Sequence, residues 1–285
     1  MVNSPQFDNP AEQKLQELLN HPAVQAGLAP FLAALIAAEL FQRVKLSGLA
    51  IIAGFAVTVY LASDFTIEPL TASRKIVLLG LVSAALGLLL SVVRLSFFSA
   101  LLPILGGAAA VWVALRILQQ QPPQTLLLWG AGCAAYVAIL VWSMDTIESD
   151  PLRAANAATA LGIGTGGAAL VGASALLGQF GLSLGSAAAA HLLIQMISNR
   201  TLPAGRAFTL PLSVIAGLTG CIAVLSAQLP WYALPILATI PVVARLMPLP
   251  RQSIRMQGLL LALPTFAIAG GAIYVAWRSA GDIPF

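Results

Sequence analysis

The sequence predicts an all-α, polytopic integral membrane protein with about ten transmembrane helices in an inverted five-plus-five repeat. The first observation is composition: the 285 residues are 59% hydrophobic and only 8% charged, whereas soluble domains carry about 25% charged residues. The second is that apolar runs of ~20 residues, each long enough to cross a bilayer, recur along the whole chain. The third is that two short sequence patterns return at one constant offset. Composition therefore excludes a soluble enzyme.

Residues 1–23 form a polar N-terminal segment in which we expect a short amphipathic helix. Asn9 can cap this helix, Pro10 fits its first turn, and Glu12 stands where a capping box places its acid. An acidic start of this kind is not a signal peptide, which begins with basic residues. The helix could lie on the membrane surface or pack on the protein. Because surface helices are usually basic, we expect packing on the protein.

The remainder divides into a first five-helix half (24–144), an acidic linker (145–155), a second five-helix half (156–278) and a short tail (279–285). The ten apolar segments that give this division are 24–42, 46–63, 76–93, 96–118, 125–143, 156–178, 182–198, 207–228, 231–247 and 257–277. Segments 182–198 and 231–247 are close to the shortest length that spans a bilayer. Eight or nine crossings therefore remain an alternative.

The distribution of lysine and arginine predicts the orientation. Nine of the 14 Lys and Arg residues follow odd-numbered segments, and five are on the opposite side. The nine are Arg43, Lys45, Arg94, Arg153, Arg200, Arg206, Arg245, Arg251 and Arg255. Since basic loops are retained in the cytoplasm, we expect both termini to face outward. We expect the protein in the inner (plasma) membrane of a bacterium.

The two halves share short patterns at an offset of 132 residues. Leu-Thr-Ala-Ser-Arg at 70–74 corresponds to Leu-Pro-Ala-Gly-Arg at 202–206, and Leu-Pro-Ile-Leu recurs at 102–105 and 234–237. A chain rich in Leu and Ala also produces chance matches. If the duplication is real, five crossings in each half require the halves to enter the membrane from opposite sides.

Helix-breaking residues at matching positions in the two halves suggest a binding site. They are Pro103, Gly106 and Gly107 in segment 96–118, and Pro235, Thr239 and Pro241 in segment 231–247. A break in a spanning helix frees backbone carbonyls that lipid cannot satisfy, and paired breaks are typical of transporter sites. The alternative is that these residues only kink the helices, as is common in membranes.

His191 is the only ionisable residue near the middle of a segment, and Gln195 shares its helical face. Such residues usually point inward, and histidine can exchange protons near neutral pH. We therefore place both in the predicted site. The alternative is a neutral histidine that joins neighbouring helices through hydrogen bonds.

Other patterns are interpreted as structural. The glycine run 162–167 lacks the Lys-Ser/Thr of a phosphate loop, and Gly162 and Gly166 form a small-xxx-small pair suited to close helix packing. Cys133 and Cys221 lie inside apolar runs, which indicates small buried residues rather than a disulfide or metal pair. We expect no metal site, no cofactor, no catalytic residues and no nucleic-acid partner.

Two functions fit these features. The first is a small secondary transporter whose site for a small molecule or ion lies between the inverted halves. Ten helices in two such halves are similar in plan to several small carrier superfamilies, including the drug/metabolite transporters, without matching residues. The second is a non-catalytic integral subunit or scaffold of a larger membrane complex, favoured by the scarcity of charge within the membrane. A polar cavity at mid-depth would distinguish the transporter from the scaffold.

Overall fold

The computed structural model describes residues 10–44, 46–63, 68–92, 98–226, 229–250 and 252–280, and every regular element within them is helical. Eight helical segments in these ranges are long and apolar enough to cross a membrane. They are Val24–Val44 around α2 (Ala29–Phe41), Ala72–Ser91 in α4, Ser99–Leu118 in α5, Pro123–Asp145 (α6), Pro151–Gly172 (α7), Ala175–Ser198 (α8), Arg206–Ser226 (α9) and Ile254–Ser279 (α11). The chain is therefore a multi-pass helical membrane protein.

Two of the ten predicted segments form shorter apolar helices. Segment 46–63 becomes a 3₁₀ turn followed by α3 (Ala50–Ser63), and segment 231–247 becomes α10 (Ala233–Leu246). A straight helix of 14 residues is ~21 Å long, less than the ~30 Å of the hydrocarbon core. Ten full crossings thus remain a prediction.

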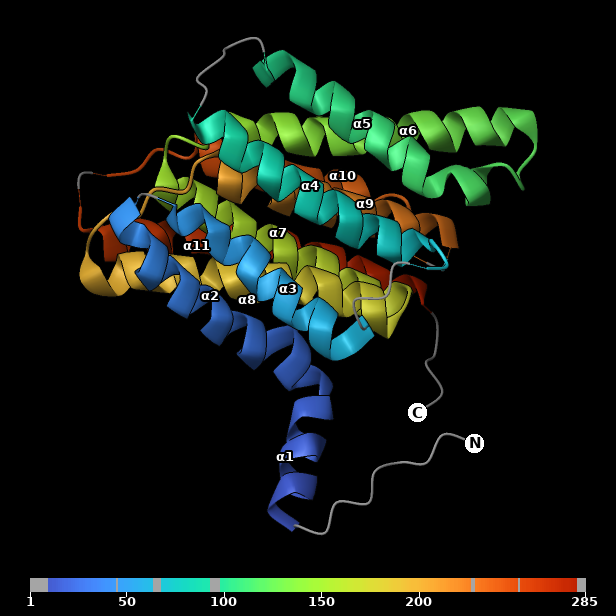
Figure 1. The fold of residues 1–285 in the computed structure, drawn as a ribbon. Coiled ribbons are helices and arrows are strands. Elements are labelled where there is room, and N and C mark those ends of the chain that lie inside the picture. Colours follow the sequence, from blue (N-terminus) through green and yellow to red (C-terminus); the bar gives the residue numbers. More distant parts are fainter. Residues whose placement is uncertain are drawn as a thin grey trace.

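The N-terminal helix α1 (Pro10–Asn20) projects from the bundle (Figure 1). Its C-terminal leucines, Leu18 and Leu19, are 58% and 39% exposed. These two leucines therefore do not pack on the protein, contrary to expectation. The proposed cap residue Asn9 lies outside the described residues. Exposed leucines on an amphipathic helix suit the membrane surface instead.

Loops that follow odd-numbered segments meet at one end of the bundle. The Ser47 hydroxyl, before α3, donates to the Pro203 carbonyl, before α9, over 2.6 Å. At the start of α9, Arg206 reaches Asp145 at the end of α6. The loops after the first, fifth and seventh segments therefore lie at the same end of the bundle, as the orientation prediction requires. Lys45, Arg94 and Arg251, which contribute to that prediction, lie outside the described residues.

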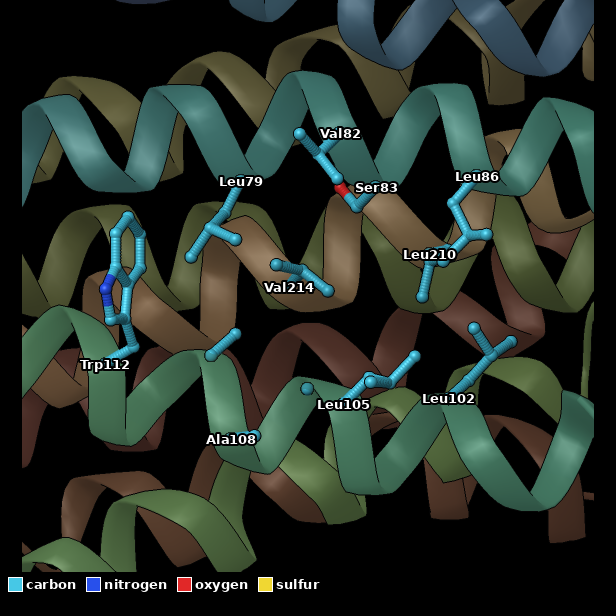
Figure 2. Close-up of a pocket in the computed structure, with 12 residues that line it drawn as sticks. Leu79, Val82, Ser83, Leu86, Leu102, Leu105, Ala108, Trp112, Leu210 and Val214 are labelled. Atoms are coloured by element: carbon cyan, nitrogen blue, oxygen red, sulfur yellow. The ribbon is translucent and has the colours of Figure 1, made fainter.

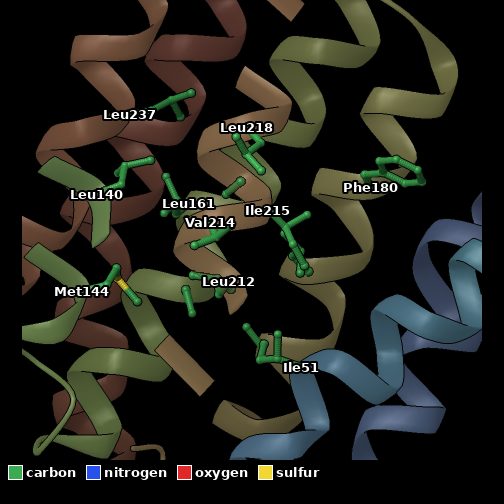
Figure 3. Packing of buried hydrophobic residues seen from close by; sticks show 14 of the residues in the cluster. Ile51, Leu140, Met144, Leu161, Phe180, Leu212, Val214, Ile215, Leu218 and Leu237 are labelled. Carbon is green, nitrogen blue, oxygen red and sulfur yellow. The ribbon is translucent and has the colours of Figure 1, made fainter. Parts of the chain in front are cut away.

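The centre of the bundle is α9, which packs against α4, α5, α6, α7 and α8. Figure 3 shows side chains of α9, such as Leu212 and Leu218, among those of the surrounding helices. In the most apolar stretch of α9, 94% of the residues are buried, compared with 28% in α11. Position, rather than apolar character, distinguishes α9 from its neighbours.

The tightest helix pair is α7 with α8, and it confirms that the glycine run serves packing. A Cβ atom added at Gly162 would lie 2.3 Å from the backbone nitrogen of Gly185, and one at Gly166 would lie 2.3 Å from that of Leu182. Small residues allow the two backbones to touch, which favours association in lipid. Although α7 is the least apolar of the eight spans, 78% of its most apolar stretch is buried.

The helix pairs of the two halves correspond only in part. Hairpins α2–α3 and α7–α8 are both packed, as are α5–α6 and α10–α11, and α4 (Ala72–Val92) packs on its expected counterpart α9. However, α7 packs extensively on α11, whereas their counterparts α2 and α6 have no comparable interface. The inverted repeat is therefore unconfirmed.

Candidate functional site

The residues predicted to break the first of the paired helices lie within a continuous helix. Pro103 is inside α5 (Phe98–Leu118) and half-buried. Gly106 and Gly107 are buried against α6, because added Cβ atoms would lie 3.0 Å from Val141 Cγ2 and from the Ala134 carbonyl oxygen, respectively. The expected unwinding at 103–107 is absent, and the two glycines permit close α5–α6 packing.

The second expected break is also absent. Helix α10 continues from Ala233 to Leu246 with Pro241 inside it. Pro235 and Thr239 are exposed on the outside of the bundle, and the Thr239 hydroxyl donates to the Ile236 carbonyl of its own helix over 2.7 Å. A threonine can satisfy its hydroxyl in this way on a lipid-facing surface.

His191 and Gln195 are both on α8 and have no exposed surface. The Gln195 amide nitrogen lies 3.1 Å from His191 Nδ1 and donates to the Pro151 carbonyl over 3.3 Å. The His191 ring packs on Phe208, with ring centroids 4.8 Å apart. His191 is seven residues from the end of α8, ~10 Å along the axis. It therefore lies closer to the middle of its helix than to the end.

The predicted site residues are thus distributed over three places. The α5 residues pack mainly toward α6, while α10 packs mainly on α11 and α7, and His191 with Gln195 lies beneath the start of α7. No feature of the described residues joins these three places into one cavity. The paired breaks were the reason to expect such a cavity.

A buried polar group that was not predicted links α7 to α11. The Asn156 side-chain amide donates to the Gly258 carbonyl over 3.1 Å, and the Thr265 hydroxyl donates to Asn156 Oδ1 over 2.8 Å. Both side chains are fully buried. An asparagine just inside an apolar segment was the available signal, because such residues often join membrane helices.

Replacing Asn156 with alanine should lower the free energy of unfolding by about 1–2 kcal/mol, because it removes a buried interhelical hydrogen bond. Thermal unfolding in detergent measures this effect. The control is Thr239→Ala, which removes an exposed hydroxyl and should change stability by less than about 0.5 kcal/mol. Equal stability of the two variants would show that the Asn156 bonds contribute nothing.

An ionic cluster joins the linker to the central helix. Arg206 Nε lies 2.8 Å from Asp145 Oδ1 and 3.1 Å from Glu148 Oε2, and Arg206 Nη2 donates to the Ser99 hydroxyl over 2.5 Å. Asp150 instead caps α7 by accepting the Arg153 backbone N–H over 3.2 Å. Within the acidic linker, Asp150 thus caps the next helix, whereas Asp145 and Glu148 bind an arginine from the other half.

Burial raises the pKa of Glu148 above its ordinary 4.5; the attraction of Arg206 opposes this and the nearby Asp145 adds to it. A carboxyl whose pKa is raised by folding stabilises the fold fully below its ordinary pKa and loses that contribution as pH rises through the raised value. Glutamine resembles the protonated form of this carboxyl. Glu148→Gln should therefore raise the unfolding temperature at neutral pH and have no effect at about pH 4. An equal shift at both pH values would contradict this assignment.

Some buried polar atoms of the described residues have no hydrogen-bond partner. They are Tyr136 Oη, Thr165 Oγ1, His191 Nε2, Gln195 Oε1 and Thr219 Oγ1. A polar atom without a partner in a low-dielectric interior costs about 1–3 kcal/mol.

The described residues contain no group of three or more His, Cys, Asp or Glu side chains placed to hold a metal ion. No protein-family model matches the chain, and no curated protein matches it.

Proposed function

We propose that the protein is a non-catalytic, non-transporting integral subunit of a membrane complex. The observation that carries this proposal is the closure of the bundle interior around α9. Side chains that a transporter would use, including His191, Gln195 and Thr219, are fully buried. A substrate path through the bundle would require polar side chains that water reaches.

Outward-facing glycines support a role in assembly. Cβ atoms added at Gly132 of α6 and at Gly270 and Gly271 of α11 would meet no atom within 4 Å. Small residues on the surface of a spanning helix allow another helix to approach closely, which is the main source of helix association in lipid. The α6 and α11 surfaces are therefore the proposed contacts with partner helices.

The second candidate is the transporter, which the partnerless polar atoms favour. Thr165 and Thr219 lie 14 and 13 residues from the starts of α7 and α9, so both are ~20 Å along their helices. Hydroxyls at equal depth on helices that pack together could bind a small molecule or ion in an opened conformation. The inverted repeat would supply the two rocking halves of such a carrier.

Cysteine accessibility distinguishes the two functions. In a Cys133→Ala, Cys221→Ala background, Ser213→Cys and Thr219→Cys place thiols on the buried face of α9. For a subunit, a water-soluble thiol reagent should label neither position in native membranes. Thr71→Cys and Thr201→Cys, exposed at opposite ends of the bundle, are the positive controls. Labelling at 213 or 219 would establish a water-filled path and favour the transporter.

The same controls test the orientation. We expect Thr71→Cys to react in intact cells and Thr201→Cys to react only after permeabilisation, because Thr201 lies in the arginine-rich loop before α9. The reverse pattern would invert the predicted topology.

Leucine substitutions test the assembly surfaces. Gly132→Leu and Gly270→Leu should convert a complex extracted in mild detergent into the free chain, because the added side chains prevent close approach. Ala85→Leu, at an exposed small residue of α4, is the matched control. If the protein is extracted as the free chain before any substitution, the subunit proposal is wrong.

A further inference from the structure

A lateral groove separates α4 from α5. These helices make only a small interface with each other, and α9 forms the floor between them. The groove encloses about 380 Å³, within the range of small-molecule pockets. Figure 2 shows Leu79 and Leu86 from α4, Leu102 and Leu105 from α5, and Val214 from α9 around it. The side chains that line it are apolar apart from the Trp112 indole N–H and the Ser83 hydroxyl, which donates to the Gly80 carbonyl over 2.8 Å.

The groove opens sideways toward lipid. Its rim residues Val82, Leu105 and Trp112 are 52%, 45% and 38% exposed, whereas Ser83 at its floor is 6% exposed. Val82 is ten residues into α4, so the opening lies ~15 Å along that helix, at the level of acyl chains. Hydrocarbon chains are the molecules that surround the opening.

A buried cation lies at one end of this groove. Lys75, one helical turn before Leu79, is only 7% exposed. Its Nζ donates to the Trp112 carbonyl over 3.0 Å and lies 4.6 Å from the centre of the Trp112 ring. An ammonium group has three N–H donors. In the described part of the chain, no carboxylate is within 4.0 Å of it.

We propose that this groove binds one acyl chain of an anionic glycerophospholipid whose phosphate pairs with Lys75. From Lys75 to Leu86 is 11 residues, or ~16 Å of helix, close to one leaflet of a ~30 Å hydrocarbon core. A lipid in the leaflet next to Lys75 can therefore place its phosphate at the ammonium and its chain along α4, α5 and α9. A charge-assisted hydrogen bond from Lys75 holds the phosphate. The selectivity comes from net charge, because the cationic choline of a zwitterionic lipid is repelled by the Lys75 ammonium whereas an anionic headgroup is not. This site is independent of whether the protein assembles or transports.

Native mass spectrometry of the purified full-length protein, titrated with phosphatidylglycerol or phosphatidylcholine, tests the proposal. The wild type should retain one phosphatidylglycerol more tightly than phosphatidylcholine. Lys75→Gln should weaken phosphatidylglycerol binding about tenfold, as expected for one hydrogen bond to a charged group, while Lys75→Arg should retain it. Arg116→Gln, at an exposed cation in the last turn of α5, is the matched control.

A second variant tests the chain-binding part separately. Ala109→Phe fills the groove but keeps Lys75, so both lipids should bind more weakly than to the wild type. Ala267→Phe adds the same ring on exposed α11 and should leave binding unchanged. If Lys75→Gln binds phosphatidylglycerol as the wild type does, or Arg116→Gln loses as much affinity, the headgroup assignment is wrong. If Ala109→Phe leaves the affinity for both lipids unchanged, the groove does not hold the acyl chain.

Discussion

Replacing Gly162 with alanine is expected to abolish stable folding, although alanine is ordinarily the better helix former. The added Cβ would lie 2.3 Å from the Gly185 nitrogen and 2.6 Å from its Cα. Both atoms belong to backbone, so no side-chain rotation relieves the clash, and α7 and α8 must separate. Because α7–α8 is the tightest helix pair, we expect a loss above about 5 kcal/mol, which exceeds the whole free energy of unfolding of a marginally stable domain.

The native cysteines provide the readout for this experiment. Cys133 and Cys221 are both buried, so a thiol-reactive dye should bind them only when the bundle opens. Gly270→Ala makes the same chemical change where no atom lies within 4 Å, and it should leave the unfolding temperature unchanged or slightly raised. A Gly162→Ala protein that unfolds at the wild-type temperature would show that the α7–α8 backbone contact is not as close as described.

The second large effect is expected on replacing Arg206 with methionine. The Asp145 and Arg206 side chains are each 12% exposed, so removal of the arginine leaves a carboxylate largely buried and without its cation. Breaking a buried ion pair in this way typically costs about 3–5 kcal/mol. Since Arg206 also binds Ser99 at the start of α5, the connections among α5, α6 and α9 should weaken together. Thermal unfolding of the purified variant measures the loss.

A second substitution distinguishes the unpaired charge from lost packing. Asp145→Asn in the Arg206→Met background should recover part of the stability, because it removes the unpaired carboxylate. Arg255→Met removes an exposed arginine that donates to the Met196 and Ile197 carbonyls, and it should cost far less. If Arg206→Met and Arg255→Met are equally stable, the Asp145 pair contributes nothing beyond an ordinary surface contact.

The class of the protein and the positions of its apolar segments could be predicted from the sequence, because burial in lipid requires long apolar runs and few charges. The packing role of Gly162 and Gly166 was also predictable, since their four-residue spacing places both on one helix face. The sequence could not identify α9 as the central helix. Its apolar residues resemble those of its neighbours, and lipid and protein interiors favour the same side chains.

The predicted site failed for a related reason. Proline at 103 and 235 was interpreted as a break. However, α5 continues through Pro103, as membrane helices with proline can when neighbouring groups satisfy the freed carbonyl. Pro235 lies in the first turn of α10, where proline removes no helical hydrogen bond. The polar residues that do join helices, Asn156 and Arg206, have partners distant in sequence. Gly258 is 102 residues from Asn156, and Asp145 is 61 residues from Arg206. Pairing over such separations is visible only after folding.

The weakly apolar, extensively buried helix α7 has a consequence for how the protein enters the membrane during synthesis. A segment with this composition gains less from lipid contact than any other span, yet α8 follows it after only two residues, Ala173 and Ser174. The glycine-bearing faces of α7 and α8 can pack together before the helices that follow them have been synthesised. The insertion machinery should therefore release α7 and α8 together as a preformed hairpin, and α7 without α8 should be left partly outside the bilayer.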